Sequence, residues 1–186
     1  PLLAERFTQS LWAGRGGALI FAASRDFWSQ AVIAEVYTLN VLLFLLLLLF
    51  VLYFEDTLKT RWLYLAASVL GLAMTNHSTI LPLAPVFFGW VFLRHRELSL
   101  KPILIANLVA GFLLGFSIIL YLPMRSAVDP VMDWGNPETL SAAWDHFLRR
   151  QYSAAEEPRA RTILGQGLLV WRFLETFAAE FTPWVA

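Results

Sequence analysis

The sequence has no cysteine among its 186 residues. Disulfide bonds, thiolate nucleophiles and cysteine-bound metals are therefore excluded for these residues, and the redox compartment stays undetermined. Charge is scarce as well, because 15% of the residues are charged where a soluble domain typically carries about 25%. Lysine plus arginine balances aspartate plus glutamate at 14 each, so no field of one sign points to nucleic acid or to an acidic partner.

Hydrophobic residues make up 58% of the chain, against about 45–50% in a soluble domain. This excess predicts an all-α, polytopic helical membrane protein. A helix needs about 20 mostly apolar residues to cross the bilayer. We assign residues 1–122 to a transmembrane helical bundle, with spans at about 14–24 (in part), 32–54, 62–76, 79–93 and 103–122.

Two short loops, at residues 55–61 and 94–101, hold the basic residues Lys59, Arg61, Arg94, Arg96 and Lys101. Short loops rich in lysine and arginine stay on the cytoplasmic side of the membrane. Alternation of the spans then places residues 24–40, residues 75–79 and everything after residue 122 on the opposite side. The polar segments of the chain therefore converge on the non-cytoplasmic face.

Residues 123–186 are richer in proline and charge, and we interpret them as an extracytoplasmic loop with amphipathic helices that leads into a further span. One helix is expected over residues 136–152, with Asn136 as its N-cap and Pro137 at its first position. Another is expected over residues 164–181. The chain starts at Pro1 and stops at "FTPWVA" without a polar tail, so we expect a fragment of a longer protein.

Glu35, Tyr37 and Asn40 precede the leucine-rich half of the second span. An acid in the first turn of a helix is favoured by the helix dipole, which explains Glu35 without function. Ionisable groups at membrane depth also face water-filled cavities or substrate paths, and Asn40 lies more than a turn deeper. Both interpretations stay open on the pattern alone.

The run "TNHST" (75–79) separates two apolar stretches. Asn76 can end one helix in the left-handed conformation, and Ser78 or Thr79 can cap the next. A turn does not require His77, although a histidine at such a place is more often a hydrogen-bonded interface residue than a catalyst.

Basic and acidic side chains of the last third allow two interpretations each. Arg125, Arg149 and Arg150 have the shape that grips a phosphate in two places, while snorkelling or a solvated helix end explains them equally. The acids at positions 129, 133 and 138 suit a divalent metal or a base, but turn formation explains their sequence context and we favour turns.

Three blocks in series, "FWSQAVIAEVYTLN", "LGLAMTNHSTILPLAPV" and "MDWGNPETLSAAWDHFLRRQY", resemble the DUF2723 (transmembrane protein 260-like) membrane family. That family includes bacterial proteins of uncharacterised function and an animal protein O-mannosyltransferase, and it looks like a branch of the GT-C glycosyltransferases. The resemblance implies transfer of a sugar from a polyprenyl-phosphate donor to an acceptor hydroxyl, including protein serine or threonine, on the non-cytoplasmic face. The resemblance further implies that the protein lies in the bacterial inner membrane or in the membrane of the eukaryotic endoplasmic reticulum.

The resemblance also implies a substrate-binding surface. Its candidate residues are Glu35, Tyr37, Asn40, Asn76, His77, Arg125, Asp133, Trp134, Arg149, Arg150 and Tyr152. GT-C enzymes usually carry their catalytic acid in the first external loop, which would lie ahead of Pro1, so no catalytic residue is assigned and the fragment alone is expected to be inactive. The sequence gives no metal site, leaves a divalent metal requirement open and implies no cofactor besides the lipid-linked donor.

Two other classes of protein fit the same pattern. A transporter or carrier would line a polar path with Glu35, Asn40 and His77, and it predicts polar residues throughout the depth of the bilayer. A membrane scaffold without chemistry would use each polar group only to cap a helix.

Overall fold

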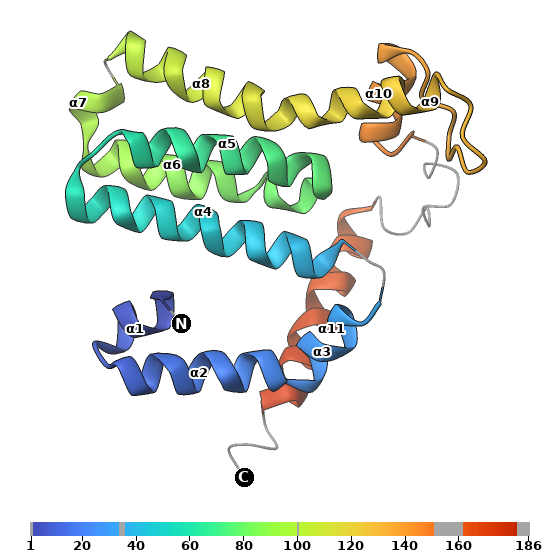
Figure 1. Ribbon diagram of the computed structural model, residues 1–186. Coiled ribbons are helices and arrows are strands. Elements are labelled where there is room, and N and C mark those ends of the chain that lie inside the picture. The colour runs from blue at the N-terminus through green and yellow to red at the C-terminus, as the bar shows by residue number, and fades with distance from the viewer. Residues whose placement is uncertain (1, 34–35, 100, 151–161, 182–186) are drawn as a thin grey trace. The chain divides into compact units, whose positions relative to one another are not determined.

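The computed structural model describes residues 2–33, 36–99, 101–150 and 162–181. Every regular element within these ranges is a helix (Figure 1). The elements are α1 (Leu2–Thr8), α2 (Leu11–Ala23), α3 (Arg25–Ala31), α4 (Tyr37–Thr57), α5 (Arg61–Asn76), the 3₁₀ helix η1 (Ser78–Ile80), α6 (Leu83–Arg94), α7 (Arg96–Ser99), α8 (Pro102–Phe116), the 3₁₀ helix η2 (Ser117–Leu120), α9 (Tyr121–Ser126), α10 (Leu140–Phe147) and α11 (Ile163–Phe181). The chain forms two compact units, Pro1–Met124 and Arg125–Ala186.

The helices α4, α5, α6 and α8 of the first unit run in alternating directions (Figure 1). Short connections between apolar helices favour this antiparallel arrangement of neighbours. As a result, the basic connections after α4 and after α6 lie at one end of the bundle. The start of α4 and the end of α5 lie at the other end.

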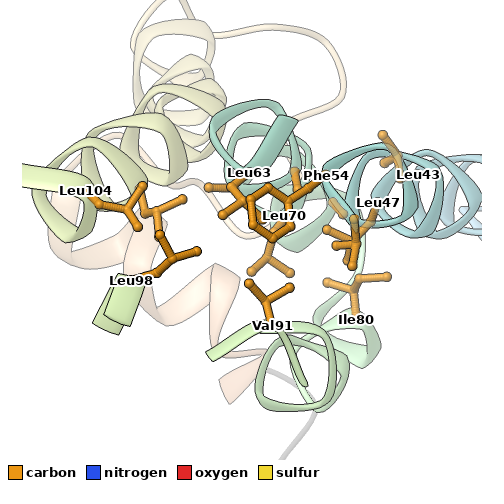
Figure 2. Packing of buried hydrophobic residues seen from close by; sticks show 14 residues of the cluster. Leu43, Leu47, Phe54, Leu63, Leu70, Ile80, Val91, Leu98 and Leu104 are labelled. Atoms are coloured by element: carbon orange, nitrogen blue, oxygen red, sulfur yellow. The ribbon is translucent and has the colours of Figure 1, made fainter. Parts of the chain in front are cut away.

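The core of the first unit is a stripe of aliphatic side chains from these helices. On α4 the buried residues Leu43, Leu47, Val51 and Phe54 recur at helical spacing. Figure 2 shows Phe54 beside Leu63 and Leu70 of α5, in the same cluster as Val91 of α6 and Leu104 of α8. Many other leucines of α4 stay partly exposed, and a helix that is apolar all round is typical of burial in lipid or in a large core.

Glycines let α5 and α8 approach each other closely. A Cβ atom on Gly115 would collide with the backbone oxygen of Ser68 and would lie 2.8 Å from the backbone nitrogen of Leu72. On the opposite helix, a Cβ on Gly71 would collide with the carbonyl of Phe112. Small residues at such crossings are the usual means by which membrane helices pack, because lipid supplies no hydrophobic drive between them.

Among the described residues, two helices are long and apolar enough to cross a membrane. They are Tyr37–Thr57 and the continuous segment Pro102–Ser126, and each has a mean hydropathy of 2.5. The segment Ser78–Arg94 is apolar but shorter. Two of the expected spans are therefore helices that could cross a membrane by their length and composition. The crossing of the membrane by the other expected spans, α2 and α5 among them, stays a prediction.

Ion pairs cluster at the end of the bundle that carries the basic loops. Glu55 Oε2 lies 3.3 Å from Arg94 Nε, and Glu55 Oε1 lies 3.4 Å from His95 Nε2. The neighbouring Asp56 accepts two hydrogen bonds from Arg6 of α1. These bonds raise the pKa of Arg6 above its ordinary value. Acids at the C-terminal end of α4 oppose the helix dipole, and these cations offset that cost.

Two local expectations are wrong. The helix expected from Asn136 begins at Leu140 as α10, because Thr139 has the extended conformation of an N-cap and its Oγ1 accepts the N–H of Ala142 at 3.1 Å. Asn136 itself has a φ of +43° and belongs to the preceding turn. The left-handed end expected at Asn76 is also absent, since Asn76 is the last residue of α5 and the helix is capped by His77.

Candidate functional site

His77 lies between α5 and η1 at the end of the bundle opposite the ion pairs. Its backbone is extended (φ −157°, ψ 128°), so it ends α5 and also serves as the N-cap of η1. The expected cap residues, Ser78 and Thr79, are instead part of η1. A histidine in this position explains how the two apolar stretches are joined with a sharp change of direction.

The imidazole of His77 is held by Thr79. The backbone N–H of Thr79 donates to Nδ1 at 3.3 Å, and Thr79 Oγ1 lies 2.8 Å from the same nitrogen. A backbone N–H only donates, so Nδ1 acts as an acceptor and the neutral ring carries its proton on Nε2. His77 therefore presents a donor at Nε2. The ring of Tyr37, the first residue of α4, lies 6.0 Å from that of His77.

Asn40 extends this hydrogen-bonded chain to α4. Its Nδ2 donates to Thr79 Oγ1 at 3.4 Å, which leaves the threonine hydroxyl proton directed at His77. The Oδ1 atom of Asn40 is buried, and no donor among the described residues reaches it. Since buried polar atoms are nearly always satisfied, this oxygen is an acceptor that still needs a donor.

Asn76 connects α5 to the chain just ahead of α4. Its Nδ2 donates to the carbonyl oxygen of Val36 at 3.0 Å, across 40 residues of sequence. The structure thus brings Tyr37, Asn40, Asn76 and His77 to the same end of the bundle, and their binding of a substrate stays a prediction. Glu35, which the sequence placed with them, lies outside the described residues.

The second unit contains a separate polar cluster around Asp133. Ser126, which is buried, donates from Oγ to Asp133 Oδ2 at 2.6 Å. When the amide of Asn136 is oriented with its nitrogen toward the carboxylates, it donates to Asp133 Oδ2 at 2.8 Å and to Glu138 Oε1 at 3.3 Å. Asp133 is therefore held in a turn. Within the described residues, no three His, Asp or Glu side chains gather in a way that suits a metal ion.

Gly135 in that turn has a φ of +79°, a conformation that favours glycine. A Cβ atom at this position would lie 3.0 Å from Nδ1 of His146 on α10. The turn and α10 therefore pack closely, and Trp134 of the same turn is 70% exposed.

The basic candidates differ in their surroundings. Arg125, in the last turn of α9, is exposed. Arg150 donates to Asp145 Oδ1 at 2.5 Å, an exposed pair of the kind that contributes little and can exchange partners. Arg149 has a φ of +56° just past the end of α10, and Tyr152 lies outside the described residues.

Sequence analysis missed the parts played by Thr79 and Ser126. Thr79 was considered only as a helix cap, and Ser126 was not singled out. Their partners lie 39 and 7 residues away in sequence, so no local pattern reveals these bonds. The one available signal was that each lies beside a candidate residue.

Comparison with known proteins supplies the family. Residues 3–101 match the family model described as the protein O-mannosyl-transferase TMEM260 N-terminal domain. The chain is 30% identical over 148 residues to protein O-mannosyl-transferase TMEM260 of Mus musculus, which covers 74% of this chain and 21% of the mouse protein. It is 29% identical over 161 residues to protein O-mannosyl-transferase tmem260 of Dictyostelium discoideum, covering 78% of this chain and 20% of that protein.

The chain thus spans about a fifth of the length of these curated relatives. No solved structure gives a significant match. The family model covers more than half of the 186 residues, and both relatives bear the same name as the model. The chain belongs to the family of the protein O-mannosyl-transferase TMEM260 N-terminal domain.

Proposed function

We propose that this chain is part of a polytopic, GT-C-like membrane glycosyltransferase. The whole protein would move mannose from a polyprenyl-phosphate carrier to a serine or threonine hydroxyl of a protein acceptor. Its relatives are named as protein O-mannosyl-transferases, and this name supports the choice of sugar and acceptor. Transfer would take place on the non-cytoplasmic face of the bacterial inner membrane or of the endoplasmic reticulum.

One observation carries this proposal: the hydrogen-bonded cluster of Asn40, Thr79 and His77 lies at the end of the bundle opposite the basic loops. Positive loops mark the cytoplasmic side, so the cluster belongs to the side at which lipid-linked sugars of this kind are used. The cluster offers an acceptor at Asn40 Oδ1, which no donor among the described residues reaches. A sugar hydroxyl can donate to such an oxygen.

The reaction in the proposal is an inverting displacement. The acceptor oxygen attacks the anomeric carbon, the bond from that carbon to the phosphate oxygen breaks, and the phosphate leaves with the electron pair. Arg125, or the pair Arg149 and Arg150, would stabilise the charge on the leaving phosphate, which is usually a large part of catalysis. His77 would hold Thr79 and, through it, Asn40 in place, and it would not serve as the base, because Nδ1 is already engaged by Thr79. We assign the base to none of the described residues.

The carrier alternative agrees less well with α4. A translocation path needs polar groups through the depth of the bilayer. After Asn40, however, α4 has only apolar side chains until Tyr53. The polar groups of α4 therefore lie at its ends, as expected for a surface that acts on one side of the membrane.

Two substitutions of His77 in the full-length protein test this role. His77→Gln keeps a donor near the position of Nε2, whereas His77→Asn keeps the cap at the position of Nδ1 and loses the distal donor. We expect His77→Asn to lower kcat/KM for mannosyl transfer from polyprenyl-phosphate mannose to a peptide by about ten- to a hundredfold, the effect of one hydrogen bond lost from the site. His77→Gln should retain more of the activity.

The neighbouring variant Thr75→Ala is the matched control, because among the described residues the hydroxyl of Thr75 bonds only to the carbonyl of Leu72 in its own helix. It should leave transfer unchanged. Equal activity of His77→Asn and the unmodified protein would remove His77 from the site. Absence of mannosyl transfer by the unmodified, correctly folded protein would overturn the function itself.

A further inference from the structure

The loop after α9 directs apolar side chains outward. Val131 and Met132 have exposed fractions of 105% and 89%, and Val128 is 65% exposed. We call residues 127–132 the apolar loop. Adjacent large apolar side chains that are fully exposed mark a surface that contacts something other than water.

The base of the apolar loop is polar and closed. Ser126, just before the loop, is 2% exposed and donates to the carboxylate of Asp133, just after it, at 2.6 Å. Asn136 donates to the same carboxylate at 2.8 Å. These bonds hold the two ends of the loop together. Val131 and Met132 are therefore exposed at the tip of a loop whose ends are held in place.

The apolar loop starts where a candidate membrane helix ends. The segment Pro102–Ser126 is long and apolar enough to cross a bilayer, and Met132 is only six residues beyond its last residue. Six extended residues reach at most about 20 Å, and the closed base shortens that reach. The tip therefore stays near the membrane surface at which the helix ends.

The charges around the apolar loop fit a lipid surface without net charge. Arg125 and Asp129 are both exposed and flank the tip with one charge of each sign. Asp129 also opposes deep insertion, because a carboxylate is costly in hydrocarbon. Trp134, which follows the loop and is 70% exposed, is of the type enriched at headgroup level.

We propose that the apolar loop is a bilayer contact, which inserts Val131 and Met132 into the headgroup–acyl boundary of the leaflet where α9 ends. The partner is the lipid surface, and a protein partner is the alternative that the experiment excludes. This contact would fix the start of the second unit at the membrane surface. It does not depend on the proposed transfer reaction.

The test uses the full-length protein in phosphatidylcholine vesicles, with Met132→Cys carrying an environment-sensitive nitrobenzoxadiazole dye. We expect blue-shifted emission, strong quenching by lipids that carry a nitroxide near the headgroup, and protection from iodide in the water. Val131→Cys should behave in the same way. The control is Glu138→Cys, an exposed site beyond the closed base, which iodide should quench and the lipid nitroxide should not.

Two results would overturn the proposal. Quenching of the dye at Met132 by iodide to the same degree as at Glu138 would place the tip in water. Protection from both iodide and lipid nitroxide at Val131 and Met132 would place it against protein. A third variant tests the closed base: Ser126→Ala should lower nitroxide quenching at Met132 without changing it at Glu138, and unchanged quenching would show that the base does not hold the loop at the surface.

Discussion

At the scale of single residues, hydrogen bonds between distant side chains shape the candidate site. Asn76 bonds to the carbonyl of Val36, and Asn40 bonds to Thr79. The first bond connects the end of α5 to the residue before α4, and the second connects the first turn of α4 to η1. The geometry of the site therefore depends on amide side chains, which carry no charge and attract little notice in a sequence.

Replacement of Asn76 by alanine should lower stability. The bond from Asn76 to Val36 is partly buried, and its loss should cost about 1 kcal/mol, because the carbonyl of Val36 then keeps only the backbone N–H of Asn40 as a donor. The midpoint of heat unfolding of the purified full-length protein should fall. Thr75→Ala serves again as the control and should unfold close to the unmodified protein, whereas an equal decrease in both variants would contradict the part given to Asn76.

The residues of this site were predictable from sequence in identity but not in role. Asn40, Asn76 and His77 stand out because polar groups interrupt apolar runs. The cap formed by His77 was not predictable, since serine and threonine next to it are the more usual cap residues. The direction that the backbone takes after α5 makes His77 the cap residue, and that direction depends on how the helices pack.

At the scale of elements, the closest packing is that of α5 against α8. Gly115→Ala should be destabilising, because its Cβ would meet the backbone of Ser68 and Leu72, which cannot rotate away. Overpacking of this kind costs about 1–3 kcal/mol. Gly89→Ala in α6 is the matched control, because a Cβ there meets nothing within 4 Å and alanine favours the helix by about 0.5–1 kcal/mol.

Heat unfolding of the two glycine variants gives the comparison. The midpoint should fall for Gly115→Ala and should stay or rise for Gly89→Ala. Similar midpoints for both variants would show that the backbones of α5 and α8 are not in contact at Gly115.

The two adjacent acids at the end of α4, Glu55 and Asp56, should contribute differently to the stability of the protein. Asp56 pairs with Arg6, and the side chains are 46% and 29% exposed, so Asp56→Asn should lower the stability little. The side chain of Glu55 is only 15% exposed and faces both Arg94 and His95. Glu55→Gln leaves Arg94 without this acid and leaves His95 with only Glu97, whose Oε1 lies 3.9 Å from Nδ1, so it should lower the same unfolding midpoint more. A larger effect of Asp56→Asn would contradict this order.

The helices were predicted well where the apolar stretch is long. They were predicted less well where the same residues are typical of both a turn and a helix start. The helices α4 and α8 fall on leucine-rich stretches that leave few alternatives. The start of α10 was placed too early, because Asn136 and Pro137 are typical of a helix start but also of a turn. The bonds of Ser126 and Asn136 to Asp133 favour the turn, and these bonds are invisible in a local pattern.

At the scale of the whole molecule, the account depends on sidedness. In the first unit the basic loops and the ion pairs of Glu55 lie at one end, and the cluster of His77 lies at the other. The sequence pattern predicted this separation from the alternation of spans. How the second unit joins that surface in the full-length protein is part of the proposal, because its polar residues follow the span that ends at Ser126.

The most direct measurement is labelling of single cysteines in the full-length protein within intact membranes, using a thiol reagent that does not cross the bilayer. Ser78→Cys, beside His77, and Glu138→Cys, beyond the apolar loop, should react from the non-cytoplasmic side, while Lys59→Cys should react only from the cytoplasmic side; all three positions are exposed. Reaction of Ser78→Cys from the same side as Lys59→Cys, or of Ser78→Cys and Glu138→Cys from opposite sides, would contradict the account.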